Sequence, residues 1–152
     1  MTLEIMPATL EHLDQVAGNA RPEDVAELLA SSGDDPAQVL KHGHRVSSLC
    51  LAGVVAGEAV CVVGVSPVCA AYGLGSPWMV GTTALDRHAR KFARVSRPVV
   101  EEMNRVYPHL ANFVDNRNDK AIRWLEWMGF KFYPPRPHGV LGLPFMLFER
   151  KS

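Results

Sequence analysis

The stretch "NDKAIRWLEWMGF", residues 118–130, predicts a short helix that ends abruptly. Asn118 lies where an N-cap side chain would accept a hydrogen bond from a free backbone N–H. Gly129 suits the left-handed conformation that ends a helix, so Phe130 is expected to return to the core. The apolar residues recur at helical spacing, and they are Ala121, Trp124, Leu125 and Met128, with Trp127 beside them. From these residues alone, a well-capped core helix is the simpler interpretation, and a helix beside a binding site is the alternative.

The composition is that of an ordinary globular protein. The chain has 152 residues, of which 47% are apolar and 21% charged, so we expect one domain over residues 1–152 with a core of its own. The formal net charge is zero. General nucleic-acid binding is therefore not expected, because it needs an excess of positive charge.

The cysteines and the first residues of the sequence point to a reducing compartment. There are three cysteines, Cys50, Cys61 and Cys69, without CxxC spacing, which speaks against a disulfide framework or a metal site. The first residues carry acidic groups and lack a signal-peptide pattern. No apolar run approaches the length of about 18 residues that a membrane span needs. A cytoplasmic location is the simplest expectation.

Hydrophobic periodicity and turn residues predict alternating helices and strands. Helices are expected over residues 10–17, 22–33, 36–43, 85–108 and 119–128. Thr9 and Asp35 are expected to cap two of them, and Pro98 is expected to kink or break the fourth. Strands are expected over residues 3–7, a hairpin at 46–67, and then 77–83, 110–115, 130–134 and 145–151. This order indicates a mixed α/β fold with a mainly antiparallel sheet.

A family resemblance adds to this pattern. Asn118, Ala121, a bulky pair and Gly129-Phe130 resemble the closing motif of the GNAT superfamily of acyl-CoA-dependent N-acyltransferases. In that family the helix follows the fifth strand and flanks the pantetheine arm of the cofactor. The resemblance implies a twisted sheet of six to seven mostly antiparallel strands with helices on both faces, in which the fourth and fifth strands splay apart.

The resemblance also implies acetyl-CoA as the cofactor and assigns residues to it. The backbone of Met79, Val80 and Gly81 would pair with pantetheine, and Asn118 and Trp124 would lie beside the arm. The segment with Arg87, His88, Arg90 and Lys91 would hold the pyrophosphate, since side-chain cations bind phosphate well. The alternative for this segment is a solvated helix face, which is what runs of charge usually are.

Two positions depart from the family pattern. The family commonly has a Tyr seven residues after the Asn, which protonates the departing thiolate, whereas this chain has Leu125. The family also has a Gly-rich turn before the phosphate-binding helix, and here no glycine follows Gly81 before residue 129. A thiolate can leave without an acid, because an ordinary thiol has a pKa of about 8.5.

The general base is the least determined residue. A carboxylate or His near the attacking amine could take its proton, and the fourth strand has no carboxylate. Asp115, at the end of the fifth strand, is the candidate, although it could instead cap the following helix. His88 and Glu58 are more distant candidates. The rigid loop over residues 134–144 either borders the acceptor site, as in the family, or is only a proline-stiffened turn.

More narrowly, the chain is similar to short GNAT-like internal virion proteins of tailed phages. The stretches "RPEDVAE", "PWMVGT", "SRPVVEEM" and "GLPFMLF" carry this similarity. It implies an acetyl-CoA-dependent N-acetyltransferase that acts on an amine of a host protein, in the cytoplasm of the infected bacterium or in the virion. The alternative is a fold with little or no catalysis that serves as a host-protein-binding or internal virion protein.

Overall fold

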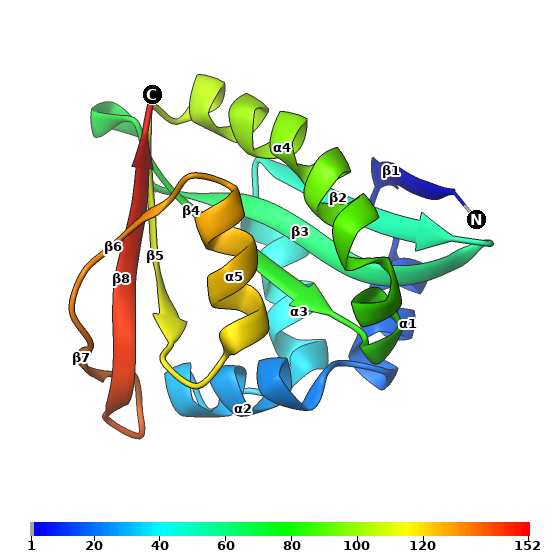
Figure 1. Ribbon diagram of the computed structural model, residues 1–152, viewed down its shortest axis with the longest axis horizontal. Helices are drawn as coiled ribbons and strands as arrows, with labels where there is room; N and C mark the ends of the chain where they lie inside the picture. Colours follow the sequence, from blue (N-terminus) through cyan, green and yellow to red (C-terminus); the bar gives the residue numbers. More distant parts are fainter. Residues whose placement is uncertain (1) are drawn as a thin grey trace.

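The computed structural model describes residues 2–152 and contains one eight-stranded sheet in the order β1-β2-β3-β4-β5-β8-β6, with β7 paired to β8 (Figure 1). The pairing is antiparallel except between β4 and β5. The strands are β1 (Leu3–Pro7), β2 (Leu49–Val55), β3 (Glu58–Cys69), β4 (Leu74–Gly81), β5 (His109–Asp115), β6 (Lys131–Phe132), β7 (Arg136–His138) and β8 (Leu143–Lys151). The predicted mixed α/β class and mostly antiparallel sheet are confirmed.

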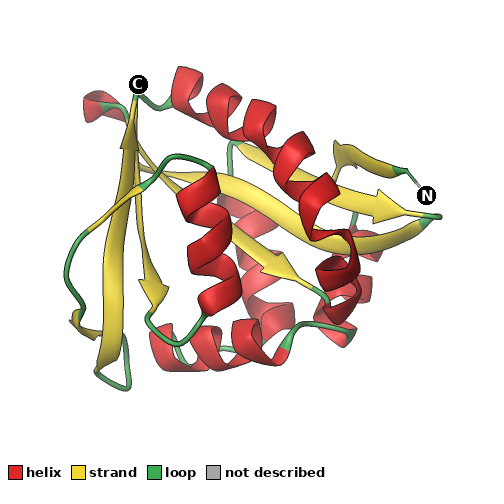
Figure 2. Ribbon diagram, in the orientation of Figure 1, coloured by secondary structure: helices red, strands yellow, loops and turns green. Residues whose placement is uncertain are grey.

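Helices cover both faces of this sheet, as predicted (Figure 2). They are α1 (Leu10–Gly18), α2 (Pro22–Ser31), α3 (Pro36–Val46), α4 (Ala89–Val106) and α5 (Asp119–Trp127), with short 3-10 turns η1 (Ala70–Tyr72) and η2 (Thr83–His88). Successive residues of β3 point to opposite faces: Val62 packs with Leu13 of α1 and Leu40 of α3, while Val63 and Val65 pack in the α4–α5 core. None of the described helices is long and apolar enough to cross a membrane.

The predicted caps of three helices and the stop at Gly129 are confirmed, whereas α3 continues past its predicted end at Gly43 to Val46. Thr9 and Asp35 each accept the N3 backbone N–H of their helix in a capping box. Asn118 Oδ1 accepts from the N–H of Ala121 at 3.2 Å and so caps α5. Gly129 has a φ of 82°, and Phe130 then packs edge-on against Phe148 with ring centroids 5.1 Å apart. The quoted stretch therefore specifies its own beginning and end.

Several boundaries differ from the prediction; for example, residues 83–88 form the 3-10 turn η2, so α4 begins only at Ala89. β4 begins at Leu74, so Pro77 lies inside the strand and does not merely lead into it. α4 continues through Pro98 without a break; Arg94 and Pro98 are both exposed, so the carbonyl that Pro98 leaves unpaired can be hydrated. The expected loop over residues 134–144 contains β7, and the expected strand over residues 130–134 is reduced to β6. Local turn and proline signals did not predict β6 and β7 correctly, because both strands pair with β8, which lies later in the chain.

Trp78 of β4 lies against Gly64 of β3, and this contact allows a test of the packing. A Cβ on Gly64 would lie 2.7 Å from the Trp78 indole and 2.9 Å from the carbonyl of Leu49. Gly64→Ala should therefore lower the free energy of unfolding by about 2–3 kcal/mol, measured by urea denaturation. Gly18→Ala is the matched control, since a Cβ on Gly18 would meet no atom of another element within 4 Å, and it should change stability by less than about 0.5 kcal/mol. Equal effects of the two substitutions would contradict the packing argument.

Candidate functional site

The candidate site is the gap that opens between β4 and β5. These strands pair only at Leu74 with His109 and at Gly75 with Leu110, and then diverge. The N–H of Thr82 donates to Val60 of β3 at 2.9 Å, and hydrogen-bonding residues alternate along an antiparallel pair. The backbone groups of Pro77, Met79 and Gly81 therefore face the gap. The predicted splay of the two strands is present.

Side chains and the backbone N–H of Arg21 satisfy several of the backbone groups along the two open strand edges. At the narrow end, Asn112 of β5 spans the gap: its Nδ2 donates to the carbonyl of Pro77 at 2.8 Å, and its Oδ1 accepts from the N–H of Phe113 at 2.8 Å. At the wide end, the N–H of Gly81 donates to Asp24 Oδ2 at 2.8 Å, and the carbonyl of Gly81 accepts from the N–H of Arg21 at 2.8 Å. Pro77 has no N–H, so its place on this edge leaves no donor unpaired.

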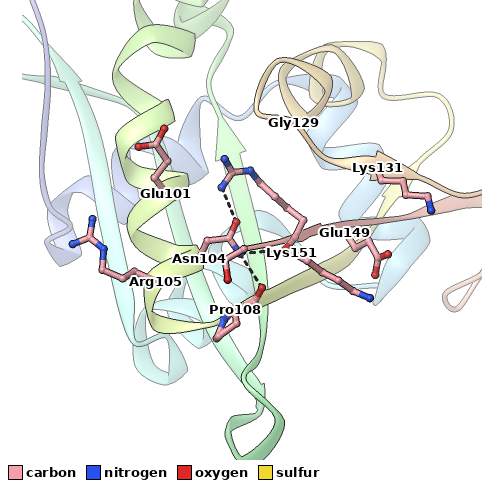
Figure 3. A pocket seen from close by; sticks show the side chains of 10 residues that line it. Glu101, Asn104, Arg105, Pro108, Gly129, Lys131, Glu149 and Lys151 are labelled. Atoms are coloured by element: carbon pink, nitrogen blue, oxygen red, sulfur yellow. Dashed lines mark hydrogen bonds between the residues drawn. The ribbon is translucent and has the colours of Figure 1, made fainter.

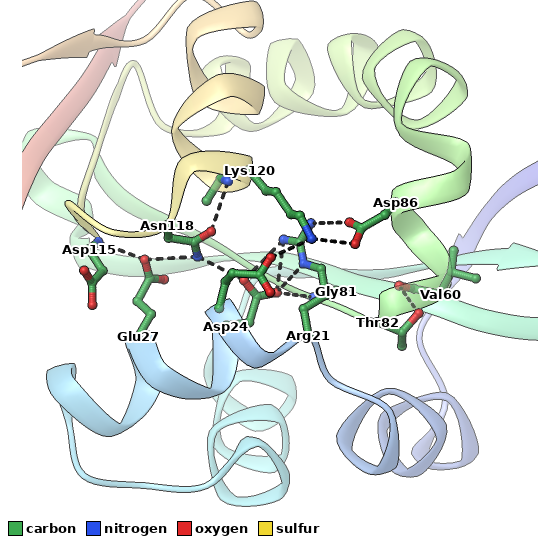
Figure 4. Close-up of polar contacts among 12 residues, drawn as sticks. Arg21, Asp24, Glu27, Val60, Gly81, Thr82, Asp86, Asp115, Asn118 and Lys120 are labelled. Atoms are coloured by element: carbon green, nitrogen blue, oxygen red, sulfur yellow. Dashed lines mark hydrogen bonds and ion pairs between the residues drawn. The ribbon is translucent and has the colours of Figure 1, made fainter.

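Helix α2 supplies a second carboxylate to the open end (Figure 4). The N–H of Asp115 donates to Glu27 Oε1 at 2.8 Å. The Asn118 amide joins the two carboxylates, because its Nδ2 donates to Asp24 Oδ1 at 3.0 Å and to Glu27 Oε1 at 3.4 Å. The buried Arg21 guanidinium completes the cluster through Nε and Nη2, which lie 3.1 and 3.2 Å from the Asp24 oxygens. Buried charge is tolerated here because it is paired and hydrogen-bonded.

Met79 is the exception on the β4 edge. Its backbone faces the gap between Pro77 and Gly81, and the part of the chain that the structure describes offers its N–H and C=O no hydrogen-bond partner. An unpaired donor and acceptor on a strand edge can receive an extended ligand that brings its own amide groups. Met79 is thus the place where this edge is open.

A cleft of about 470 Å³ lies next to Met79, on the face of the sheet that α4 and α5 cover. Its floor is apolar and includes Met79, Leu85, Phe92 and Trp124, while cations of Arg90, Lys120 and Arg123 lie at its rim. Trp124 is held in position, since its ring stacks on Phe92 at 5.5 Å and its Nε1 donates to Ser96 Oγ at 2.8 Å. The cleft has the apolar floor that small-molecule sites share, and its charged lining residues are four cations and the anion Asp86.

A smaller cavity of about 130 Å³ passes between the splayed strands. Its lining includes Val39 of α3 on one face of the sheet and Ala121 and Leu125 of α5 on the other. Met79 and Trp124 line both the cleft and this inter-strand cavity. The two hollows therefore meet at these residues, and groups bound in them would approach each other there.

The structure brings most of the predicted backbone and helix residues to this junction. Met79 and Trp124 line both hollows, and the buried Val80 lines the inter-strand cavity. Gly81 is adjacent, but its N–H is bonded to Asp24. Asn118 is only 1% exposed and lines neither hollow, because its amide is used by the helix cap and the two carboxylates. Asn118 thus organises the site from beneath.

The predicted cationic segment is divided. Arg90 lines the cleft, whereas Arg87 and His88 lie in η2 and Lys91 in the first turn of α4, outside the cleft lining. The sequence prediction missed Arg123 and Lys120 of α5. Lys120 Nζ lies 2.6 Å from Glu23 and 2.7 Å from Asp86, so it ties α5 to α2 and η2. Their spacing with Trp124 and Trp127 along α5 was the available signal.

Asp115, the predicted base, has both carboxylate oxygens occupied. Oδ1 accepts from the N–H and Nε of Arg117 at 2.8 and 3.0 Å, and Oδ2 accepts from Nη2 at 2.7 Å. Burial would raise the pKa of Asp115, but the hydrogen bonds from Arg117 outweigh burial and hold this pKa below its ordinary value. Asp115 does not cap α5 either, since Asn118 does so. These contacts disfavour proton transfer at Asp115.

Glu27, which the sequence prediction missed, has the opposite environment. Burial raises the pKa of Glu27 to about 7; the hydrogen bond from the Asp115 N–H opposes this rise, and the charges of Asp24 and Asp115 add to it. Glu27 Oε2 has no hydrogen-bond partner among the described residues. Every fully buried side-chain oxygen of these residues has a partner, so Oε2 is accessible to solvent. A carboxylate with a pKa near 7 and an open oxygen is suited to proton transfer at neutral pH.

No tyrosine takes the place that Leu125 leaves. Leu125 is buried and lines the inter-strand cavity. The Tyr133 hydroxyl donates to Glu149 at 2.5 Å, Tyr107 is paired with Ser48, and Tyr72 is 87% exposed. None of the three lines the cleft or the cavity. Among the described residues, no group of His, Cys, Asp and Glu is arranged to hold a metal ion.

A third hollow, of about 940 Å³, lies where the C-terminal part of α4 meets β8 (Figure 3). It is lined by residues of α4, β6 and β8, among them Asn104, Lys131 and Arg150. Asn104 Oδ1 accepts from Arg150 Nη1 at 2.6 Å, and its Nδ2 donates to the carbonyls of Tyr107, Pro108 and Arg150. These bonds fasten the end of α4 to β8, so this hollow has a structural explanation.

Comparison with solved structures identifies the fold. An acetyltransferase of the GNAT family from Streptococcus pneumoniae aligns with a TM-score of 0.66 at 12% identity, over 99% of this chain and all of that one. The chain has the GNAT fold. A ribosomal-protein-alanine N-acetyltransferase from Brucella melitensis aligns with a TM-score of 0.71 at 17% identity, over 99% and 100% of the two chains.

An aminoglycoside acetyltransferase in complex with coenzyme A aligns equally well, with a TM-score of 0.70 at 15% identity, over 99% of this chain and 95% of that one. The sequence matches no protein-family model and no curated protein. At these identities the GNAT similarity establishes how the chain folds.

The raised pKa of Glu27 predicts a pH-dependent stability. An ordinary Glu titrates near 4.5 and Glu27 near 7, so the folded state binds more protons between these values, and the free energy of unfolding falls as pH rises through them. Glu27→Gln keeps an oxygen for the N–H of Asp115 and removes the charge facing Asp24, Asp115 and Arg117. The free energy of unfolding of Glu27→Gln minus that of wild type should therefore increase by about 2–3 kcal/mol from pH 4.5 to pH 8, measured by urea denaturation.

Glu126→Gln, on the exposed side of α5, controls for the loss of one carboxylate. Its difference from wild type should stay within about 0.5 kcal/mol across the same pH range. If the wild-type and Glu27→Gln profiles ran parallel, Glu27 would not have the raised pKa.

Proposed function

We propose that the protein is an acetyl-CoA-dependent N-acetyltransferase that transfers the acetyl group to a primary amine. The observation that carries this proposal is the free backbone of Met79 at the junction of the cleft and the inter-strand cavity. The pantetheine arm of acetyl-CoA has amide groups that can pair with a strand edge. An amine that entered through the inter-strand cavity would then approach the thioester between Met79 and Trp124.

The cleft residues fit the cofactor. The apolar floor suits the arm, and Trp124 provides a fixed wall. Arg90 and Arg123 provide side-chain cations for the pyrophosphate in place of a glycine-rich turn. Arg87, His88 and Lys91 belong to the same proposal, as groups around the first turn of α4 that add positive charge near the phosphates. Asn118 would support the site indirectly, because its side chain binds Asp24 and Glu27 of α2 and caps α5.

The chemistry would proceed without an acid. Leu125 occupies the position of the family Tyr and cannot donate a proton. A thiolate is a stable leaving group near neutral pH, because an ordinary thiol has a pKa of about 8.5. Asp115 was the predicted base, and its fully occupied carboxylate makes Glu27 the better candidate.

The biological setting is part of the proposal. The similarity to short GNAT-like proteins of tailed phages supports an acceptor amine on a protein of the infected host. The cytoplasm of that host, or the virion, would be the location. The clustered cations beside the exposed Trp127 offer a surface that such a partner could contact.

A second candidate function rests on a different observation. The N–H of Gly81, which would pair with pantetheine, is bonded to Asp24, and Lys120 is held between Glu23 and Asp86. A protein that kept the fold for binding a host protein, with little or no catalysis, could have its cofactor groups occupied in this way. Acetyl-CoA binding separates the two candidates.

Met79→Pro tests the role of the Met79 backbone. Its N–H faces the gap, so proline removes the proposed donor without removing a bond to β3, as Pro77 already does two residues earlier. Acetyl-CoA binding, measured by titration calorimetry, should weaken at least tenfold. Met79→Ala controls for the lost side chain and should weaken binding less than about threefold. If wild-type protein gives no heat with millimolar acetyl-CoA, the binding-protein candidate is favoured instead.

Arg90→Ala tests the phosphate-binding assignment. Loss of one charge-assisted contact should weaken binding of acetyl-CoA about 5- to 20-fold, and the loss should shrink at high salt. Arg105→Ala is the matched control on the same helix, because Arg105 pairs with Glu102 far from the cleft. An Arg90→Ala protein with unchanged affinity would show that the pyrophosphate lies elsewhere.

A further inference from the structure

The inter-strand cavity combines aromatic walls with one open carboxylate oxygen. Five aromatic residues line it: Trp78, Phe113, Trp124, Phe145 and Phe148. Asp24 and Glu27 are its acidic residues. Asp24 has its oxygens bonded to Arg21, Gly81 and Asn118. Glu27 Oε2 is therefore the acidic oxygen of this cavity that is left for a ligand.

No cation among the described residues forms a hydrogen bond or an ion pair with Glu27. Oε1 accepts from two neutral donors, the N–H of Asp115 and the amide of Asn118. The anions Asp24 and Asp115 raise its pKa, and the Arg117 guanidinium, which also feels the Glu27 charge, forms its ion pair with Asp115. A cation that entered the cavity would gain a charge-assisted hydrogen bond and aromatic contacts together. The cavity thus favours a positively charged guest.

Its size limits what that guest can be. A volume of about 130 Å³ is far below that of sites that enclose a drug-sized molecule. It corresponds to roughly four water molecules at about 30 Å³ each. An ammonium group on a short unbranched carbon chain fits this space, whereas an amino sugar ring with its substituents does not.

We propose that the inter-strand cavity is a subsite for a primary alkylammonium group on an unbranched chain of about four carbons, which donates an N–H to Glu27 Oε2. The role of this subsite as an acceptor site rests on the proposed acetyl transfer. Binding of the ammonium group can be tested without acetyl-CoA. The subsite narrows the acceptor to an alkyl amine of the lysine side-chain type. Amino sugars, the substrates named for one of the structural neighbours, are excluded by size.

The subsite would also prepare the amine for reaction. The ammonium transfers one proton to Glu27 Oε2, which leaves a neutral amine. The nitrogen electron pair forms the N–C bond to the thioester carbonyl carbon, the C–S bond breaks, and its electron pair leaves on sulfur. The second proton passes from nitrogen to solvent. The products are an amide and the free thiol of coenzyme A once the thiolate takes up a proton.

The test uses n-butylammonium chloride as the probe, with 1-butanol as a neutral molecule of the same length. NMR of protein labelled with ¹³C at Glu carboxyl carbons follows Glu27, assigned from the signal missing in Glu27→Gln. At pH 8 and constant ionic strength, butylammonium should shift the Glu27 signal saturably and lower its titration midpoint by about one pH unit. Butanol should bind at least tenfold more weakly.

Two variants separate charge from space. Glu27→Gln should weaken butylammonium binding at least tenfold, measured by ligand-observed NMR, and leave butanol binding within about twofold. Ser31→Leu, which fills the cavity from α2 without changing charge, should weaken both probes. The proposal is overturned if butylammonium binds as well as before to both variants, or if butanol binds wild type as tightly as butylammonium does.

Acetyl-CoA titrations on the same samples keep this proposal separate from the proposed function. Binding of butylammonium without binding of acetyl-CoA would support the subsite and contradict the acetyl transfer. Binding of acetyl-CoA without binding of butylammonium would support the proposed acetyl transfer and contradict the subsite. Glu27→Gln should keep its affinity for acetyl-CoA within about twofold, because Glu27 does not line the cleft.

Discussion

The structure depends on how the two strand edges that diverge at the middle of the sheet are satisfied. β4 and β5 pair at one end and then separate, so each exposes backbone donors and acceptors at a depth where unpaired groups are costly. Helix α2 resolves most of this cost with Asp24 on Gly81 and Glu27 on Asp115, while Asn112 spans the narrow end. The gap between β4 and β5 is therefore stable although no strand fills it.

The two α2 carboxylates, one turn apart, have different environments for a physical reason. Asp24 is paired with the guanidinium of Arg21 and with two further donors, so its charge is fully compensated. Glu27 receives only neutral donors on one oxygen, and burial raises its pKa to about 7. Asn118 connects them, which explains why a residue that caps α5 also contributes to the site. One group is structural, and the other is open to a ligand.

The GNAT fold places the remaining open edge where the chemistry is proposed. Met79 and Trp124 line both the cleft under α4 and α5 and the inter-strand cavity. A donor in the cleft and an amine in the cavity would meet there through a break in the sheet, not across its surface. The occupied N–H of Gly81 reduces the backbone available to a cofactor and makes Met79 decisive for the distinction between an enzyme and a binding protein.

The sequence by itself determined the local features: the capped helices, the hairpin before β4, the stop at Gly129 and the α/β order. These depend on neighbours a few residues apart, so pattern and turn chemistry suffice to predict them. The resemblance carried by residues 118–130 predicted the splay, which the structure shows, and a phosphate-binding segment, which stays a prediction and of which Arg90 lines the cleft. The boundaries predicted at Pro77 and Pro98 were wrong, because the effect of a proline depends on whether the affected backbone group finds another partner or water.

Only the tertiary structure decided the roles of Asp115, Glu27, Lys120 and Arg123. Whether a carboxylate is neutralised, or left open beside a cavity, depends on residues from other elements, such as Asn118 against α2, which no local pattern brings together.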